Sequence, residues 1–529
     1  MIAAITTDRP WLVQKYGGTS LGKLLGNIVK RIIPDYCEDH RLVVVCSALS
    51  GTLKTKGTTS LLLECIALAE LGVETQIQLI ELVHLIRDSH LAVLDTFRES
   101  QDTSSSQIYN ETKISIVKEC ENLKTFLMAT QVVGELSPRS KDRVISLGEK
   151  LACVIVAACL TMRGISAKPV ILDDVVASAF GPSPDDQAAA LDKLGSKFYH
   201  VLADEIASRV VDCGHSLPVV TGFFGIMPNS LIQTVGRGYS DLCAAMCAVA
   251  MGATELQIWK EVDGIFTADP RKIPSAKLLP SVTADEATEL TYYGSEVIHP
   301  LTMDQIREAN ISLRLKNVFK PSGEGTVIDP KTTSSDIGQP STKILSPPGV
   351  LLKGDFTVGR SQRKRPTAVT VKDDILLINV ICNRNTKSGG LLIQVFDRLE
   401  RNNIAVDLIA TSERNVSLAV HSPGDSSAVL RLKEELERFG SVAIAKNISI
   451  VTLVGHKMRS QIGVANDTLS ALATAGVNIH LISQGASEIS ISLVVNADDA
   501  NSALNAIHRE VLKIPTIEES RFQRRAWLY

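Results

Sequence analysis

The chain has 529 residues, enough for about three or four domains of ordinary size, which excludes a peptide or a disulfide-stapled mini-protein. Lys and Arg number 55 and Asp and Glu 58, and this net charge of −3 argues against a globally basic protein that binds nucleic acid or a membrane surface. Hydrophobic residues make up 45% of the chain and charged residues 21%, as in folded globular proteins rather than disordered ones.

Cysteines and apolar runs constrain the compartment. The ten cysteines lie between Cys37 and Cys382 without a C-x-x-C pair, which favours reduced thiols over a zinc ribbon or a disulfide framework. The longest apolar run, Leu151 to Leu160, is shorter than the roughly 18 residues of a membrane span, and the first residues contain no apolar signal segment. We therefore expect a cytoplasmic protein that does not bind a membrane.

From Trp11 to about Asp329, short β-rich runs alternate with helical patterns. The runs WLVQKYG, RLVVVCSA, KPVIL, SLPVVTGFFG and ELQIWKEV are separated by segments such as KLLGNIVKRII and a helix from Ser240. This alternation predicts βαβ units around a largely parallel, doubly wound α/β sheet. Because ligands bind such sheets at the carboxyl ends of the strands, the loops that leave those ends are where chemistry is expected.

The composition changes beyond that segment. Residues 330–366 are rich in Pro, Ser, Thr, Gly and Lys and are predicted to form a linker. Residues 367–446 then follow the order strand, helix, two strands, helix, strand, and residues 447–514 repeat the opening of that order. We predict two βαββαβ ferredoxin-like modules, with sheets side by side within one chain or across a dimer, and a tail at 515–529.

The first chemical candidate is KYGGTS, from Lys15 to Ser20, which follows an apolar run and precedes a predicted helix. Its two glycines permit close approach of an anion, and the helix N-terminus adds N–H donors. Lys15 supplies a cation for phosphoryl oxygens. The alternative is an ordinary βα turn with an exposed lysine. The segment matches neither the P-loop pattern nor G-x-G-x-x-G, so neither of those sites is favoured.

The second candidate is TVGRGYSD, followed by a helix of small residues. Ser240 or Asp241 would cap that helix, and the flanking glycines leave Arg237 able to present its guanidinium to a carboxylate or phosphate. An exposed loop arginine is the alternative. Cys243 and Cys247, one turn apart, have no His, Asp or Glu partners at suitable spacing, so we interpret them as buried small apolar residues rather than metal ligands.

Two further segments give weaker signals. The stretch WKEVDGIFTADPR, from Trp259 to Arg271, ends a predicted strand in a charged, turn-rich loop that could hold a nucleotide by stacking and by contacts to ribose and phosphate. Glu149 lies beside the core stripe of a predicted helix and could receive a substrate ammonium in a cleft. A solvated charge pair of Glu149 with Lys150 is the alternative, which the pattern alone favours.

These four segments resemble, in order and spacing, the amino acid kinase family, and specifically the aspartokinases. KYGGTS is similar to their KFGGTS signature, and VVVCSALS, SLGEKL, TGFFG, VGRGYSD, WKEVDGIFTADPRK and LTYYGSEVIHP resemble further blocks. The resemblance covers residues 11 to 512, and KTKGTT at Lys54–Thr59 together with WKEVDG is most similar to the fungal monofunctional enzymes. It implies an amino acid kinase fold at 11–329, followed by ACT domains at 367–446 and 447–514.

The resemblance implies transfer of the γ-phosphoryl group of ATP to the β-carboxylate of L-aspartate, which gives 4-phospho-L-aspartate on the pathway to threonine, methionine and isoleucine. The implied cofactors are ATP and Mg²⁺, and no residue is assigned as a metal ligand. The substrate carboxylate is itself the nucleophile, so no catalytic base is needed. Within this resemblance, Lys15 stabilises the transferring group, Arg237 pairs with a substrate carboxylate, Glu149 receives the α-ammonium, and Asp241 organises the pocket and its lysine.

The matching positions form three sets. The insertion leaves Thr58 as an alternative to Thr59. The resemblance also implies a lysine near residues 319–320, where Phe319 and Lys320 are both candidates. Departures from the bacterial residue types put individual nucleotide contacts in question but not the site. The catalytic set is Lys15, Arg237 and Asp241; the substrate set is Ser47, Thr59, Glu149, Phe223, Thr234, Arg237 and Ser240; the ATP set is Lys15, Gly17, Gly18, Thr19, Ser20, Lys260, Glu261, Phe266, Arg271 and Lys320.

The paired ACT domains imply feedback by an end-product amino acid, L-threonine in fungal-type enzymes or lysine in many bacterial and plant ones. They also imply a homo-oligomer, a dimer or a tetramer. Two rival functions stay open: another amino acid kinase, acting on glutamate or acetylglutamate, and a catalytically silent amino-acid sensor. The implied effector positions are Ser388, Gly390, Leu391, Asp407, Thr411, Ser412 and Glu413 in the first module and Gln461, Ile462, Asn478, Ile479 and Gln484 in the second.

Overall fold

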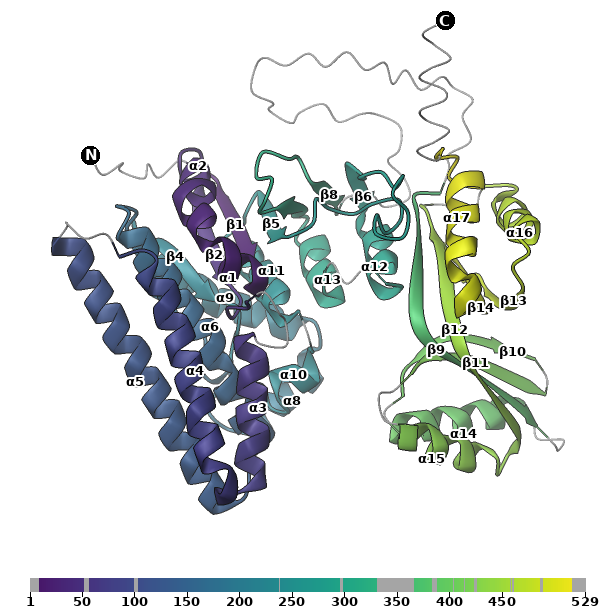
Figure 1. Cartoon of the computed structure of the whole chain (residues 1–529), viewed down its shortest axis with the longest axis horizontal. Helices are drawn as coiled ribbons and strands as arrows, with labels where there is room; N and C mark the ends of the chain where they lie inside the picture. The colour runs from purple at the N-terminus through teal and green to yellow at the C-terminus, as the bar shows by residue number, and fades with distance from the viewer. Residues whose placement is uncertain are drawn as a thin grey trace, which may run out of the picture. The chain divides into compact units, whose positions relative to one another are not determined.

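The computed structural model divides the chain into two compact units, Met1–Ile265 with Ile298–Lys331, and Phe266–Val297 with Thr332–Tyr529 (Figure 1). Most of the predicted linker and nearly all of the predicted tail lie outside the residues that the structure describes. The described residues are 9–51, 57–98, 103–236, 238–294, 298–330, 366–382, 388–402, 404–412, 414–422, 426–456, 458, 461–485 and 489–515.

The first unit is built on a largely parallel sheet, which confirms the predicted class. Its strands follow the order β3-β4-β2-β1-β5-β7-β8. Every neighbouring pair from β3 to β7 is parallel, and β8 is antiparallel to β7. The strands are β1 (Trp11–Tyr16), β2 (Arg41–Cys46), β3 (Ala167–Val170), β4 (Leu217–Thr221), β5 (Glu255–Lys260), β7 (Ser312–Asn317) and β8 (Thr326–Asp329).

Continuous apolar runs explain why the central strands form. In β2 the run from Leu42 to Cys46 is wholly buried, as is all of β4, the pattern of strands with both faces covered by helices. The helices of this unit are α1 (Gly18–Asn27), η1 (Ile28–Ile32), α2 (Ile33–Cys37), α3 (Thr58–Leu71), η3 (Val73–Thr75), α4 (Gln76–Asp95), α5 (Thr103–Val133), α6 (Pro138–Thr161), α7 (Val175–Phe180), α8 (Pro184–Leu194), α9 (Lys197–Val211), α10 (Leu231–Thr234), α11 (Tyr239–Ala250) and α13 (Pro300–Glu308).

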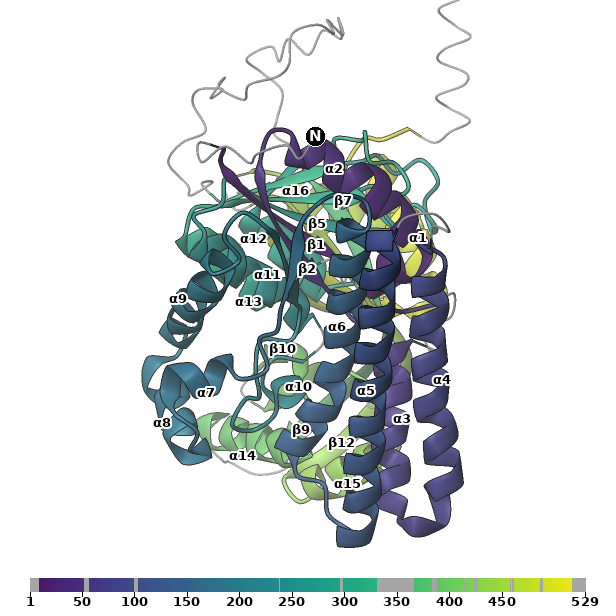
Figure 2. The same cartoon turned by 90° about the vertical axis from the view of Figure 1, so that its left-hand side faces the viewer.

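Helices α3, α4, α5 and α6 run side by side as a bundle, seen lengthwise in Figure 2. Among the described residues, α6 is the one helix with the length and hydropathy of a membrane span, but 83% of its apolar window is buried inside the protein. Its long apolar stripe therefore belongs to the core, where Val144, Leu151 and Ile155 are buried.

The second unit contains a six-stranded antiparallel sheet in the order β10-β11-β9-β12-β14-β13. Its two 15-residue strands, β9 and β12, pair along their length, so the two predicted modules share one sheet within the chain. The elements are β9 (Ala368–Cys382), α14 (Ser388–Arg401), β10 (Val406–Thr411), β11 (Asn415–His421), α15 (Ser426–Leu436), β12 (Gly440–Val454), α16 (Val464–Thr474), β13 (Ile479–Ser483), β14 (Ser490–Asn496), η5 (Ala497–Asp499) and α17 (Ala500–Glu510).

The stretch Phe266–Val297 groups with this second unit by compactness, whereas the sequence assigns it to the predicted domain at 11–329. It contains β6 (Ser281–Thr283) and α12 (Ala284–Tyr292), and α12 begins with a capping box of Thr283 and Glu286. The Glu286 carboxylate also accepts hydrogen bonds from Thr367 Oγ1 at 2.5 Å and from the backbone N–H of His456 at 2.7 Å. These bonds join α12 to the ACT sheet, and the predicted domain boundaries stay a prediction.

Candidate active site

Four neighbouring strands of the first unit end at one edge of the sheet, and a predicted site residue lies at or near each of these ends. Lys15 lies near the end of β1, Ser47 directly follows β2, and Phe223 follows β4. Lys260 is the last residue of β5. Since β4, β2, β1 and β5 are adjacent and parallel, their carboxyl ends meet, and ligands bind parallel sheets at that edge.

Two lysines converge there on one carboxylate. Lys15 Nζ lies 2.6 Å from Asp241 Oδ1, and Lys260 Nζ lies 3.7 Å from Oδ2 of the same group. Burial alone would raise the pKa of Asp241, but the charges of Lys15 and Lys260 hold it below its usual value. Burial, together with the charge of Lys15, lowers the pKa of Lys260. Two ammonium groups therefore meet at Asp241, and the charge of Glu261 also acts on Lys260.

The glycine turn packs directly against the end of β2. A Cβ on Gly18 would lie 2.2 Å from the backbone oxygen of Ala48, so only glycine fits without a shift of the backbone. Helix α1 begins at Gly18, and its first N–H groups lie beside Lys15 in the chain. Ser20 Oγ donates a hydrogen bond of 2.7 Å to Glu261 Oε1 and so joins this turn to the loop after β5.

Glu149 is 2% exposed, so the interpretation of a solvated charge pair with Lys150 is wrong. Lys150 instead pairs with Glu119 at 2.9 Å. Glu149 Oε1 accepts a hydrogen bond of 2.6 Å from the hydroxyl of Tyr239, and Oε2 has no hydrogen-bond partner among the described residues. Burial raises the pKa of Glu149 to about 7, against the opposing effects of the Tyr239 bond and the Lys15 charge.

The substrate set is joined by short contacts. Ser47 Oγ and Ser240 Oγ lie 3.0 Å apart, and the ring of Phe223 lies edge-on to Tyr239 with 6.2 Å between centroids. Tyr239 was missed by sequence reasoning. It stands beside Ser240 in the predicted segment, but nothing in that pattern says that its hydroxyl reaches Glu149.

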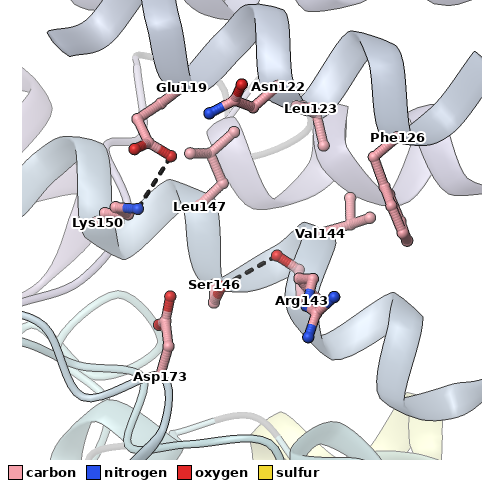
Figure 3. Close-up of a pocket in the computed structure, with 10 residues that line it drawn as sticks. All are labelled: Glu119, Asn122, Leu123, Phe126, Arg143, Val144, Ser146, Leu147, Lys150 and Asp173. Atoms are coloured by element: carbon pink, nitrogen blue, oxygen red, sulfur yellow. Dashed lines mark hydrogen bonds and ion pairs between the residues drawn. The ribbon is translucent and has the colours of Figure 1, made fainter.

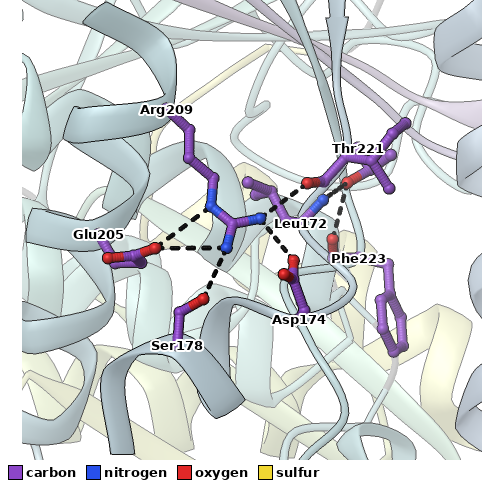
Figure 4. A network of polar contacts seen from close by, with 8 residues as sticks. Leu172, Asp174, Ser178, Glu205, Arg209, Thr221 and Phe223 are labelled. Atoms are coloured by element: carbon purple, nitrogen blue, oxygen red, sulfur yellow. Dashed lines mark hydrogen bonds and ion pairs between the residues drawn. The ribbon is translucent and has the colours of Figure 1, made fainter. Parts of the chain in front are cut away.

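Several hydrogen bonds fix the loop that carries Phe223 (Figure 4). Thr221 Oγ1 donates to the Phe223 carbonyl at 2.9 Å and accepts from the Leu172 N–H at 3.1 Å. Arg209 binds the same segment, because its guanidinium donates to the carbonyl of Ile171 at 3.1 Å and to Asp174 at 2.6 Å. The loop after β3 is thereby held against the end of β4.

The other predicted residues lie on other elements of the first unit, in the second unit, or outside the described residues. Thr58 is buried and Thr59 half-buried at the start of α3, and Thr234 ends α10. Lys320 pairs with Asp263 at 3.2 Å. The two remaining nucleotide residues, Phe266 and Arg271, belong to the second unit, and Arg237 lies outside the described residues.

A cavity of about 330 Å³ lies between α5, α6 and the loop after β3 (Figure 3). Arg143, Lys150 and Asp173 line it together with apolar side chains, and none of these residues belongs to the predicted site. Cys243 and Cys247 are buried free thiols, as predicted. Across the described ranges, no group of three His, Cys, Asp or Glu side chains is arranged to hold a metal ion.

The implied effector residues lie around the two edge strands of the ACT sheet. Asp407 and Thr411 lie on β10, and Ile479 begins β13. Leu408 of β10 and Leu481 of β13 belong to one buried cluster, so the two edges approach each other. Glu413 lies outside the described residues, as does the side chain of Ser388. The other positions are Gly390 and Leu391 in α14, Ser412 after β10, Gln461 and Ile462 before α16, Asn478 before β13, and Gln484 after it.

The fold agrees with the comparisons to known proteins. The amino acid kinase family matches residues 10–317, and an ACT domain matches residues 451–511. The aspartokinase of Saccharomyces cerevisiae is 44% identical over 97% of this chain and 95% of its own length, and that of Candida albicans is 43% identical over 95% and 90%. The chain therefore belongs to the amino acid kinase family and, within it, to the aspartokinases.

Solved structures give the same result. The crystal structure of Escherichia coli aspartokinase III in complex with aspartate and ADP (R-state) has a TM-score of 0.69 and 25% identity over 95% of this chain and 99% of that one. The same enzyme in complex with lysine and aspartate (T-state) also scores 0.69, over 94% of this chain.

Proposed function

We propose that this chain transfers the γ-phosphoryl group of ATP to the β-carboxylate of L-aspartate, giving 4-phospho-L-aspartate and ADP. The observation that carries the proposal is the strand-end cluster, in which Lys15 and Lys260 flank Asp241 next to the glycine turn. Fungal aspartokinases that are 41 to 44% identical over nearly the whole chain support the same activity.

The cluster suits phosphoryl transfer because this reaction demands positioning and charge neutralisation rather than a covalent nucleophile. Lys15 and Lys260 bring two ammonium groups to one strand edge. Both can stabilise the equatorial oxygens of the transferring group. The N–H groups at the start of α1 add fixed donors for phosphate oxygens.

Mg²⁺ enters this proposal with ATP rather than as a resident ion. Such Mg²⁺ is usually held by one or two carboxylates together with substrate phosphates. Asp241 and Glu261 lie in or next to the cluster and fit that role. When bound, the ion would neutralise charge on the β- and γ-phosphates.

The amino-acid end of the substrate is assigned to Glu149 and Arg237. Glu149 offers a buried carboxylate oxygen without a partner among the described residues, which suits an α-ammonium group. Arg237 would pair with the α-carboxylate of aspartate, as the resemblance implies. Phe223 and Ser47 would line the space between these two groups and Lys15.

The ACT modules are assigned to feedback by an amino acid, with L-threonine as the proposed effector and L-lysine as the alternative. The structure of E. coli aspartokinase III in complex with lysine and aspartate (T-state) supports amino-acid control of this architecture. For inhibition, the effector must bind the less active state more tightly.

We further propose a cytoplasmic homo-oligomer associated through these modules, acting in the pathway to threonine, methionine and isoleucine. The nine described cysteines, all free thiols, agree with a reducing compartment.

The test is hydroxylamine trapping of the acyl phosphate by purified full-length protein with ATP and Mg²⁺. Hydroxamate from L-aspartate but not L-glutamate, suppressed by L-threonine, is the expected result. Activity on glutamate or acetylglutamate would instead indicate a sibling kinase. Binding of an amino acid without any turnover would indicate a silent sensor and contradict the proposal.

A further inference from the structure

The second unit contains a buried lysine–aspartate pair at one of the implied effector positions. Lys372 on β9 places its Nζ 2.5 Å from Asp407 Oδ1 on β10. The Asp407 side chain is only 4% exposed, and that of Lys372 is 22% exposed. The other carboxylate oxygen, Oδ2, is buried and has no hydrogen-bond partner among the described residues. Asp407 therefore has one oxygen occupied and one that needs a donor.

An aromatic ring flanks the pair. Lys372 Nζ lies 4.9 Å from the ring centroid of Tyr292, at the end of α12, and the Tyr292 hydroxyl donates to the Val406 carbonyl at 3.4 Å. Burial, followed by the charge of Asp407, raises the pKa of Tyr292 to about 12, so the ring is neutral and can face a cation. Lys372 thus has a second favourable partner within reach if it leaves Asp407.

We propose that Lys372 occupies Asp407 as an internal substitute for the effector's ammonium group, and that an amino-acid effector binds this module by displacing it onto the ring of Tyr292. The inference rests on the proposed regulation of this module by an amino acid. An ammonium on a lysine side chain and an ammonium on a free amino acid are the same donor, so they compete for one buried carboxylate.

The competition has a measurable consequence. The apparent affinity of a ligand falls by the fraction of protein in which its site is available. Removal of the internal ammonium should therefore tighten effector binding. If the ion pair were only structural, its removal would instead weaken binding. The sign of the change separates the two roles.

The first experiment measures L-threonine and L-lysine binding by calorimetry with full-length wild-type protein, Lys372→Met and the control Lys446→Met, an exposed lysine of the same sheet. We expect the effector to bind Lys372→Met about tenfold more tightly than wild type, and Lys446→Met to match wild type. Equal or weaker binding by a folded Lys372→Met would overturn the proposal.

Loss of the pair leaves Asp407 buried without its cation, so Lys372→Met should unfold at a lower temperature than wild type. The effector should raise that temperature more in the variant than in wild type, because it supplies the missing ammonium. A smaller or equal rise would contradict the proposal, even where affinity is hard to measure.

Three variants test the Tyr292 ring as the second partner and the form of the cation on Asp407. Tyr292→Leu removes the ring and should weaken effector binding, whereas Tyr292→Phe keeps the ring and should bind nearly as wild type does. Lys372→Arg should also weaken binding, since a guanidinium fork can hold both carboxylate oxygens. If either Tyr292→Leu or Lys372→Arg binds the effector as tightly as wild type does, the displacement of Lys372 is contradicted.

A ligand without the amino group completes the test. The analogue of L-threonine that has hydrogen in place of the amino group, 3-hydroxybutanoate, should gain nothing from Lys372→Met, because it has no ammonium for Asp407. A similar gain would show that the variant acts by another route. If wild type binds neither amino acid yet forms aspartyl hydroxamate, the effector assignment and this inference both fail while the catalytic proposal stands.

Discussion

The two units each contain a lysine–aspartate ion pair, and the pairs differ in the number of lysines that face the carboxylate. In the first unit, Asp241 faces both Lys15 and Lys260. In the second unit, Lys372 pairs with Asp407, whose other carboxylate oxygen has no hydrogen-bond partner among the described residues. Two converging cations suit an anionic phosphoryl group, whereas an incompletely satisfied carboxylate suits an ammonium group.

The difference also follows from the two sheets. Parallel strands bring several strand ends to one edge, so charges from separate βα turns converge on a ligand. In the antiparallel sheet of the second unit, Lys372 and Asp407 lie within strands rather than at a common end. We propose that the first arrangement forms the reaction centre and that the second forms a contact that an effector can displace.

The largest expected effect is on Lys15. Lys15→Ala removes one of the two cations and should lower kcat by about a thousandfold, in the range seen when one transition-state donor is lost. Exposed Lys30→Ala in η1 is the matched control and should keep wild-type turnover. Steady-state hydroxamate rates measure both, with circular dichroism to confirm folding. Wild-type turnover by Lys15→Ala would remove the distinction between the two pairs.

The next effect concerns Glu149, which we expect to bind the α-ammonium only when ionised. Its pKa is raised from 4.5 to about 7, so the ionised fraction grows as pH rises through neutrality. The KM for aspartate should fall about tenfold between roughly pH 6 and pH 8. Glu149→Gln should cost about a hundredfold in kcat/KM and flatten that pH profile. A profile that the substitution leaves unchanged would exclude this role.

The raised pKa of Glu149 also makes folding stability depend on pH, and stability falls over the range in which substrate binding improves. Because the folded-state pKa is raised, the contribution of Glu149 is fully present below about pH 4.5 and is lost as pH rises through about 7. In the absence of substrate, Glu149→Gln should therefore reduce the loss of stability over that window. Denaturant melts at several pH values measure this directly.

A smaller effect is expected at the regulatory pair. Asp407→Asn should weaken feedback by about tenfold and leave kcat unchanged, because the amide holds an ammonium less strongly than a carboxylate does. Exposed Glu434→Gln is the control on α15. Inhibition curves with L-threonine compare the two. A fall in kcat with feedback intact would place Asp407 in a different role.

The smallest expected effect concerns the packing of helix α1 in the first unit. A Cβ on Gly22 would lie 2.0 Å from the backbone oxygen of Ser50, whereas one on Gly26 in the same helix meets nothing within 4 Å. Gly22→Ala should lose about 2 kcal/mol of unfolding free energy, and Gly26→Ala should change it by less than about 1 kcal/mol in either direction. Equal stability of the two variants would show that helix α1 is not closely packed against Ser50.

Much of the fold follows from local pattern. The alternating β-rich and helical segments predict the parallel sheet, and the repeated strand-helix order predicts the two βαββαβ modules. The grouping of residues 266–297 with the second unit could not be predicted, because it depends on contacts such as those of Glu286 with Thr367 and His456. Such contacts leave no periodicity in the chain.

The site residues also fall into those that the sequence predicts and those that only the structure reveals. Lys15 and Asp241 stand in compact motifs, so sequence alone selects them, and the structure brings them together. Tyr239 and Lys372 were not selected, since a tyrosine in a helix and a lysine in a strand have many ordinary roles. Their partners Glu149 and Asp407 are 90 and 35 positions away, and only the folded chain brings them into contact.

The most direct test of the central claim is to measure ADP and aspartyl hydroxamate in the same reaction, for wild type and Lys15→Ala, with ATP, Mg²⁺ and L-aspartate. We predict equal amounts of both products from wild type, dependent on aspartate, and almost none from Lys15→Ala. ADP without hydroxamate would indicate ATP hydrolysis, and equal hydroxamate from both proteins would show that the strand-end cluster is not the catalytic centre.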